Sequence, residues 1–207
     1  GLVLYAPLWH PQNSGSPFNA WDIANGGVHS CTVTGATWGI QGRTFAGGDD
    51  WIIPTDSSVF EGMAALTLEA WIKPTFTAAI LCIIGKHWSG ADGSYYLSLT
   101  ATAINFRVIN ATTAVTHTVT YSTSTSSFTH IKAVYDGAIM WIEVNGVQVG
   151  TTSAQTGAVQ TNTRGLAIGA LDTTGSQPFY GTIGEVRINS IAVLGQQGYL
   201  VTKWRYS

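Results

Sequence analysis

One stretch in the second half of the chain contains three short runs of β-forming residues separated by two turn-forming dipeptides. Asp136-Gly137 separates Phe128–Tyr135 from Ile139–Val144. Asn145-Gly146 then separates this second run from Val147–Gly150. Glycine accepts the positive φ that tight hairpin turns require, and such dipeptides between alternating apolar residues are a strong hairpin signal. The stretch therefore predicts a three-stranded antiparallel meander.

Similar strand signals recur at short intervals along the rest of the chain. They cover Leu2–Tyr5, His29–Thr34, Asp50–Ile53, Leu66–Lys73, Ile80–Lys86, Ser94–Leu99, Ala103–Ile109, Ala114–Tyr121, Leu166–Ala170 and Phe179–Ile188. No segment of useful length has helical periodicity, and only Ser58–Ala65 and Ala192–Leu200 have room for a helical turn or two. Many short strands without crossover helices predict an all-β, two-sheet antiparallel sandwich, with residues 1–207 in a single domain.

The clearest single strand is Leu66–Lys73, which ends at Pro74. Its Leu, Leu, Ala and Ile alternate strictly with Thr, Glu, Trp and Lys. Successive side chains in a strand point to opposite faces, so the apolar set is expected to face the interior. Trp71, on the opposite face of the strand, is also expected to pack in the core or between the sheets.

The two cysteines, Cys31 and Cys82, both lie in strand-like contexts. Cys82 is surrounded by apolar residues and is interpreted as a small buried hydrophobe. A single disulfide between the two remains open, but two cysteines do not form a disulfide scaffold.

Charge is scarce in this sequence. Charged residues make up 10% of the chain and the net charge is −2, whereas typical domains carry about 25% charged residues. Without a run of Lys or Arg we expect no nucleic-acid partner, and without a long apolar run we expect no membrane insertion. No signal peptide is visible at the start. A surface of hydroxyls and amides suits a protein that works outside the cytosol or inside an assembly.

Several pieces of the chain, in their order and spacing, resemble one family. They are Leu2–Trp9, the hairpin from Thr34–Gly39 through Gly42–Gly47 to Asp49–Ile52, the strand Leu66–Lys73, the hairpin Ile142–Gly146, and the closing strands Leu166–Gly169 and Phe179–Ile188. Together they resemble the laminin G-like jelly-roll domains of the concanavalin A-like lectin/glucanase superfamily. The resemblance implies a jelly-roll β-sandwich. The superfamily includes glycosidases, lectins, adhesion modules and virion proteins, so the fold alone does not select a function.

The chain departs from the family pattern at two places. Many relatives carry an acidic residue where this chain has Gly184. The final segment, Ala192–Ser207, lacks the terminal helix signature that is usual in the family. Both departures weaken any metal site that the resemblance implies.

Catalysis of glycoside hydrolysis needs two carboxylates on opposite sides of the scissile bond. Glucanases of this superfamily place them on one strand, at alternating positions. The four glutamates here are Glu61, Glu69, Glu143 and Glu185, and none has a second carboxylate two or four residues away. We therefore expect a protein that is not an enzyme.

The metal candidate is Ca²⁺, which binds carboxylate and carbonyl oxygens on turns. Asp49 and Asp50 lie on a glycine-rich turn, and Glu185 on a closing strand is the expected third ligand. The alternative is that the two aspartates form only side-chain-to-backbone turn bonds.

Aromatic residues in loop-like surroundings are the candidates for binding a ligand, since sugar rings stack on aromatic faces. Trp88, with His87 and Asp92 in the segment Lys86–Gly93, has the sequence context of an exposed site. Trp21 is a further candidate. For each tryptophan the alternative is a loop residue that folds back onto the edge of the sandwich.

Two functional hypotheses follow. The first is a non-enzymatic display or attachment protein, most simply a decoration-type protein on the surface of a virion or similar assembly, with protein neighbours and glycans as partners. The alternative is a secreted or cell-surface carbohydrate-binding module. Both place the protein on a virion surface or outside cells.

Overall fold

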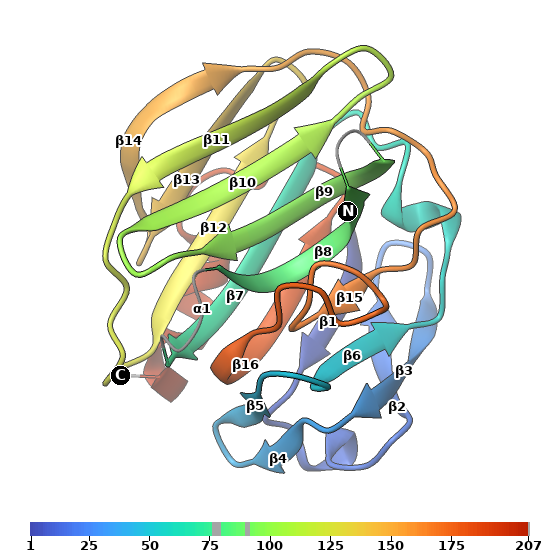
Figure 1. Cartoon of the computed structure of the whole chain (residues 1–207), viewed down its shortest axis with the longest axis vertical. Helices are drawn as coiled ribbons and strands as arrows, with labels where there is room; N and C mark the ends of the chain where they lie inside the picture. The colour runs from blue at the N-terminus through green and yellow to red at the C-terminus, as the bar shows by residue number, and fades with distance from the viewer. Residues whose placement is uncertain (76–79, 90–91, 207) are drawn as a thin grey trace.

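The computed structural model describes residues 1–75, 80–89 and 92–206, and within them the chain is almost entirely antiparallel β-structure. Sixteen strands follow one hydrogen-bonded network that folds over into two layers (Figure 1). Two 3-10 turns, η1 (Pro11–Asn13) and η2 (Ser58–Phe60), and one helix, α1 (Gln197–Tyr206), complete the described regular structure. The predicted two-sheet antiparallel jelly-roll sandwich is confirmed.

The two layers are joined at both sides. The first runs through β11 (Ala114–Thr120), β10 (Ala103–Ile109), β9 (Asp92–Leu99), β8 (Leu81–Ser89), β15 (Ala167–Ile168), β6 (Trp51–Pro54) and β3 (Gly27–Thr34). The second runs through β2 (Phe18–Asp22), β1 (Leu2–Pro7), β16 (Tyr180–Asn189), β7 (Leu66–Pro74), β12 (Thr129–Tyr135), β13 (Ile139–Val144) and β14 (Val147–Ala154). β3 pairs with β2 at one side, and β11 lies against β14 at the other. β4 (Thr37–Gly39) and β5 (Gly42–Ala46) form a hairpin that pairs with β16.

Most of the expected strands are present, including the complete meander β12–β13–β14. Two differences concern length: β14 continues to Ala154, and β15 keeps only two residues of the expected Leu166–Ala170 strand. β2 was not predicted from the sequence. Its Phe18–Asp22 stretch is only five residues long, so the alternation in it is a weak signal, and pairing with both β1 and β3 holds it in place.

The apolar core lies between the two layers, and β7 contributes the alternating set that its sequence predicts. Leu66, Leu68, Ala70 and Ile72 are all buried in it. Trp71 is also buried, but the expectation that it packs in this core is wrong. Its indole lies on the outer face of the second layer, where Nε1 donates to Thr202 Oγ1 at 2.7 Å.

The outer face of the second layer also carries a row of charged side chains, three of them buried and the fourth, Arg187, half-buried. Arg187, Glu69, Lys132 and Glu143 occupy matching positions on β16, β7, β12 and β13. The signs alternate along this charge row, and Lys132 Nζ lies 2.7 Å from Glu143 Oε2. The C-terminal segment, residues 190–206, packs over the row, and Lys132 also donates to the carbonyl of Gly195 in that segment. Opposite charges on neighbouring strands offset the cost of burying each one.

The helix α1 corrects the expectation that the chain has no terminal helix. A ten-residue helix is marginal by itself, so tertiary contacts must stabilise it. Tyr206 stacks on Trp71 with ring centroids 4.7 Å apart. A Cβ atom at position 184 would lie 2.3 Å from Tyr206 Oη, so Gly184 leaves the space that the tyrosine fills.

Both cysteines are free and buried. Cys31 packs in the core, and burial raises the pKa of its thiol to about 12. Burial likewise raises the pKa of Cys82. Thiols in this state are poor nucleophiles, which fits the interpretation of Cys82 as a small buried hydrophobe.

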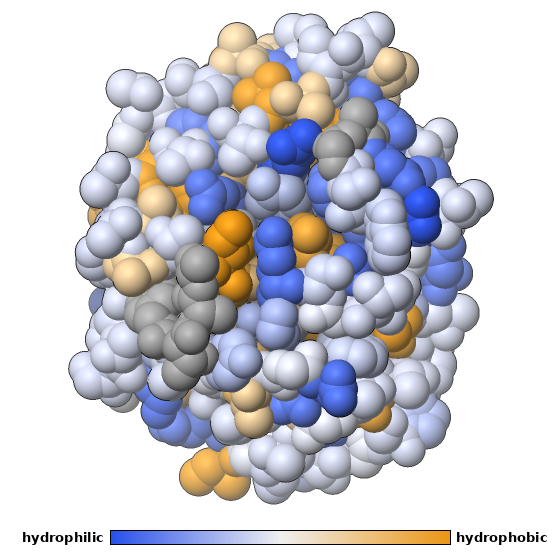
Figure 2. Space-filling view, in the orientation of Figure 1, coloured by the Kyte–Doolittle hydropathy of each residue, from blue (hydrophilic) through white to orange (hydrophobic). Residues whose placement is uncertain are grey.

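The described residues include no helix that is long and apolar enough to cross a membrane. Figure 2 shows that one broad face of the molecule is mainly pale and blue, with hydrophobic residues in small separate patches. The surface seen there is the polar one that the composition predicts.

The contact between Gly184 and Tyr206 generates a test of how the C-terminal segment is held. Gly184→Ala should displace Tyr206, lower the free energy of unfolding by about 1–3 kcal/mol and speed trypsin cleavage at Lys203 and Arg205. Limited proteolysis followed by mass spectrometry measures the cleavage. Gly39→Ala is the control, because its Cβ would meet the nearest atom at an ordinary 3.5 Å. Equal cleavage rates in both variants would show that this contact does not hold the helix.

Candidate functional site

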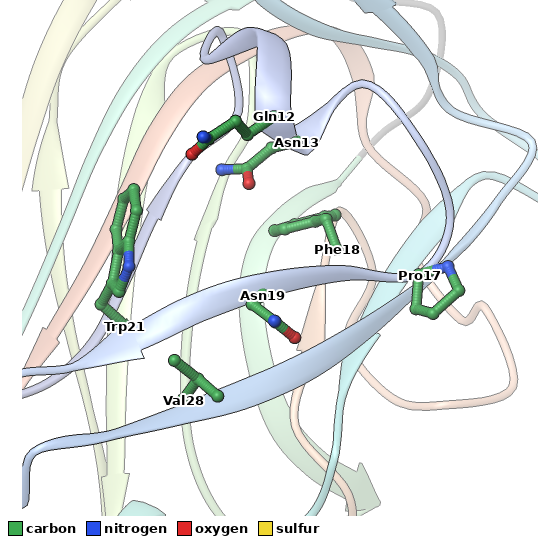
Figure 3. A pocket seen from close by; sticks show the side chains of 7 residues that line it. All are labelled: Gln12, Asn13, Pro17, Phe18, Asn19, Trp21 and Val28. Atoms are coloured by element: carbon green, nitrogen blue, oxygen red, sulfur yellow. The ribbon is translucent and has the colours of Figure 1, made fainter.

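A hollow of about 470 Å³ lies between η1 and the hairpin formed by β2 and β3 (Figure 3). Its described lining consists of Gln12, Asn13, Pro17, Phe18, Asn19, Trp21 and Val28. Three of these side chains are carboxamides and two are aromatic. In Figure 3 the indole of Trp21 rises from β2 toward Gln12, and Asn13 lies above Phe18.

The roof of the hollow is η1, and its short sequence explains its shape. His10 is extended and its Nδ1 accepts a hydrogen bond from the backbone N–H of Gln12 at 3.3 Å. Pro11 occupies the first position of the turn, where the lack of an N–H carries no cost. Asn13 is buried and donates from Nδ2 to the carbonyl of Pro7 at 2.9 Å. This bond fixes the Asn13 carboxamide, whereas the neighbouring Gln12 is exposed.

The floor of the hollow is the outward face of the hairpin. Asn19 and Trp21 alternate with buried neighbours along β2 and therefore point outward. Val28 pairs with Trp21 across the hairpin and is exposed. Phe18, at the start of β2, is buried and forms the inner wall. The floor thus combines apolar surface with one amide.

Arg43 on β5 holds the roof in place from behind. Its guanidinium donates to the carbonyls of Ala36 at 2.8 Å, Asn13 at 2.6 Å and Gly15 at 2.7 Å. The same group lies 5.6 Å from the centre of the Phe18 ring. The residue is only 3% exposed, and burial lowers the pKa of Arg43 from its ordinary value. A cation buried this deeply is tolerated because main-chain oxygens surround it.

Trp21 is the first ring of an aromatic cluster. Tyr5 lies 5.8 Å from it and His10 lies 6.3 Å from it, measured between ring centroids. The ring of Trp9 lies 5.4 Å from that of His10, inclined at 60° to it. These neighbours fix the orientation of the Trp21 indole while leaving it half-buried. A rigid, partly exposed aromatic face is therefore presented at the edge of the hollow.

Glu185 lies beneath this aromatic cluster and is buried. Its carboxylate accepts from Trp9 Nε1 at 3.4 Å and pairs with Arg187 at 3.0 Å. Burial raises the pKa of Glu185, and the charge of Arg187 opposes that effect. Glu185 is thus engaged in a structural ion pair.

The predicted set Trp88, His87, Asp92 and Trp21 is not one site. Trp88 is 42% exposed on β8, and Arg164 lies over its ring at 5.0 Å. Arg164 Nε also donates to Asp92 at 3.0 Å and lowers the pKa of that carboxyl. His87 is buried against Tyr96, and its contact with a ligand stays a prediction.

Trp21 lies well away from this second cluster. Its strand, β2, is four strands from β8 in the strand order and belongs to the other layer. Trp21 therefore remains a candidate ligand-binding residue, with neighbours that the sequence did not predict. Trp88 lies in a separate cluster with Asp92 and Arg164. Two residues of the predicted Lys86–Gly93 segment, 90 and 91, lie outside the described residues.

The three carboxylates predicted to bind calcium are not brought together. Asp50 accepts a hydrogen bond from the backbone N–H of Ala46, as the alternative turn interpretation expects. Ala46 pairs with Tyr180 on β16, so Glu185 lies about 16 Å further along that strand. In residues 1–75, 80–89 and 92–206 no three His, Cys, Asp or Glu side chains are grouped to hold a metal ion. The set with Glu185 is wrong, and calcium at Asp49 and Asp50 stays a prediction.

Sequence reasoning missed most of the hollow. Gln12, Asn13 and Asn19 are ordinary polar residues in a loop and an unpredicted strand, and Arg43 comes from a distant hairpin. One local signal was available. The outward Asn19 and Trp21 alternate with Phe18 and Ala20, which marks a half-buried strand with an exposed aromatic residue.

The family comparison supports the architecture described above. A family model described as the concanavalin A-like lectin/glucanases superfamily, and named for its laminin G domain, matches residues 46–197. The chain belongs to this superfamily. The resemblance of its strands and hairpins to laminin G-like domains is therefore confirmed. The search of curated proteins gives no match.

Solved structures share the fold at low sequence identity. The binding domain of botulinum neurotoxin serotype G is 10% identical with a TM-score of 0.73, over 99% of this chain and 51% of that one. Domain 4 of AbnA, an extracellular arabinanase from Geobacillus stearothermophilus in complex with arabinotriose, is 18% identical with a TM-score of 0.65, over 97% of each chain. The Ruminococcus gnavus IT-sialidase CBM40 bound to α2,3-sialyllactose is 16% identical with a TM-score of 0.59, over 70% of this chain and 86% of that one. The chain thus spans about half the length of the toxin domain.

The contacts of Arg43 predict that it stabilises the roof of the hollow. Arg43→Met should lower the free energy of unfolding by about 2–4 kcal/mol, because three carbonyls, two of them in buried contacts, lose a charged donor. Urea unfolding monitored by tryptophan fluorescence measures the loss. Arg107→Met is the matched control, since Arg107 is half-buried and donates to Thr116 Oγ1 at 3.3 Å in an exposed contact; its loss should be at most about 1 kcal/mol. A similar loss in both variants would contradict the role assigned to Arg43.

Proposed function

We propose that this protein is a non-enzymatic carbohydrate-binding module that works outside cells, and that it binds glycans in the hollow beside Trp21. The observation that carries the proposal is the combination of a fixed, half-exposed indole with three carboxamides around one concave surface. Ligand sites are typically concave and largely apolar with a few well-placed polar groups. Apolar faces of sugar rings match the indole, and their hydroxyls match amide donors and acceptors.

The comparisons support the same function, although they establish only the fold. Two of the solved structures are described with a bound oligosaccharide, arabinotriose in one and α2,3-sialyllactose in the other. A third, of botulinum neurotoxin type C, is described as depending on two ganglioside molecules for cell entry. The arabinanase is also described as extracellular. These relatives favour the carbohydrate-binding alternative over the display role among the two hypotheses.

The burial and contacts of the four glutamates support the proposal that the protein does not hydrolyse glycosidic bonds. Glu69, Glu143 and Glu185 are buried, and each lies within 3.5 Å of a basic side chain. Glu61 accepts from the backbone N–H of Asn162 at 2.5 Å. A glycosidase instead needs a general acid and a second carboxylate facing the substrate. These glutamates serve the structure.

The role of Trp21 generates the test of the proposal. Trp21→Ala should weaken glycan binding by about 30-fold or more, since central aromatic contacts contribute about 2 kcal/mol or more to binding. A glycan microarray identifies a ligand, and isothermal titration calorimetry then compares the variants. Trp88→Ala is the matched control, because Trp88 is an exposed strand tryptophan outside the hollow.

The two variants separate the candidate sites. Loss of binding in Trp88→Ala with normal binding in Trp21→Ala would move the site to the Trp88, Asp92 and Arg164 cluster. A wild-type protein that binds nothing on the array would contradict carbohydrate binding as a function.

A second candidate function is a structural role in an assembly, such as display on the surface of a virion. Large apolar side chains on the C-terminal segment favour it: Ile191, Leu194, Leu200 and Trp204 are between 50% and 70% exposed. Exposed apolar patches often mark contacts with other proteins. Protein neighbours in an assembly would cover this part of the surface.

This second role predicts that the protein isolated from its natural source travels with a particle. Size-exclusion chromatography should then show co-elution with the particle, and Trp204→Ser should shift protein into the free fraction. Val147→Ser is the control, because Val147 is an exposed apolar residue on β14, outside the C-terminal segment. Elution of the native protein entirely as a free chain would contradict the role.

A further inference from the structure

We infer that the hollow accepts uncharged sugar units, so that the ligand is a neutral oligosaccharide and not a sialylated or uronic one. This inference rests on the proposed function and names its ligand class. The solved relatives do not decide the matter, since one is described with arabinotriose, which is neutral, and another with α2,3-sialyllactose, which is acidic. The residues that line the hollow decide between a neutral and an acidic ligand.

The described lining residues include no ionisable side chain. Gln12, Asn13 and Asn19 supply carboxamides, and the other four side chains are Pro17, Phe18, Trp21 and Val28. A carboxamide carries both a donor and an acceptor, which suits a hydroxyl group. A ligand carboxylate that enters such a site loses hydration, and recovering that loss takes a charged donor such as Arg or Lys. Uncharged donors recover less of it.

The cation that lies behind the described lining, Arg43, is already held by other contacts. Arg43 is buried, and its two terminal nitrogens donate to three main-chain carbonyls, two of which belong to the roof of the hollow. Phe18 lies against the same guanidinium. Turning this group toward a ligand carboxylate would break the contacts that shape the hollow. Arg43 therefore builds the site without offering its charge to a ligand.

Other charged and polar groups of the described residues near the rim also have contacts with neighbouring residues. Arg187, beside Tyr5, pairs with Glu185 at 3.0 Å. Asp22, at the end of β2, accepts from the backbone N–H of Asn25 at 3.0 Å. His10, next to Trp21, accepts the Gln12 N–H at Nδ1 at 3.3 Å. Arg205 lies over the ring of Trp9, 3.5 Å from its centroid, and is not among the residues that line the hollow. In the described part of the rim, Arg187 and Arg205 are thus engaged by a carboxylate and by an aromatic ring.

The experiment compares neutral and acidic glycans that are otherwise matched. The wild-type protein is applied to an array that holds arabinotriose, lactose, α2,3-sialyllactose, and neutral and uronic oligosaccharides of equal length. We expect Trp21-dependent binding to neutral glycans, with each acidic partner at least about 10-fold weaker. Affinity for the best neutral ligand should change less than about twofold between about 0.05 and about 0.5 M NaCl, because no ion pair is screened.

A substitution that adds a positive charge to the hollow provides a second test. Asn19→Lys places a positive charge on the exposed floor and should raise the ratio of acidic to neutral binding by about 10-fold. Asn19→Gln, which keeps the amide, is the control and should leave the ratio unchanged. A Trp21-dependent preference of the wild-type protein for acidic glycans would overturn this inference and leave carbohydrate binding intact. No binding to any glycan on the array would instead overturn both the preference for neutral ligands and carbohydrate binding itself.

Discussion

The pairing of β16 with three other strands is the constraint on which the candidate site depends. β16 pairs with β1, β7 and β5, and its register sets Glu185 opposite Pro7 and Ile183 opposite Arg43. Pro7 and Arg43 both hold Asn13: Pro7 accepts from its side chain, and Arg43 donates to its carbonyl. Strands close to the two ends of the sequence thus meet at β16, and the roof of the hollow is stabilised from both.

The sequence predicts those parts of the fold that rest on local patterns. The β7 strand and the β12–β14 meander follow from alternation and turn dipeptides, which act over a few residues. α1 and the outer position of Trp71 depend instead on contacts between distant segments. Alternation says that Trp71 faces away from Leu68 and Ile72, but only Thr202 and Tyr206 explain why that second face is buried. A pattern of period two identifies faces, and does not say what covers them.

The candidate site shows the same division. Trp21 was recognised because an aromatic residue among polar neighbours stands out in a sequence. Its partners Gln12 and Asn19 are common surface residues, and they become informative only when η1 is folded over the β2–β3 hairpin (Figure 3). Arg43 has no local signal at all, because its role is defined by carbonyls 7, 28 and 30 residues away. Trp88 and Trp21 were both candidates because of their residue type and loop-like context, and the strand order separates them.

Many of the few charged residues in this chain are buried in the interior. Nine basic and eleven acidic residues occur in the chain, and eight of these twenty are buried: Asp22, Arg43, Glu69, Lys86, Lys132, Glu143, Asp172 and Glu185. Their charges are used on internal contacts such as the charge row and the Arg43 carbonyl cluster. The exposed surface is therefore even poorer in charge than the composition suggests. Such a surface attracts ions and charged polymers weakly, so recognition must depend on shape, aromatic faces and amide hydrogen bonds, which is how a neutral sugar is bound.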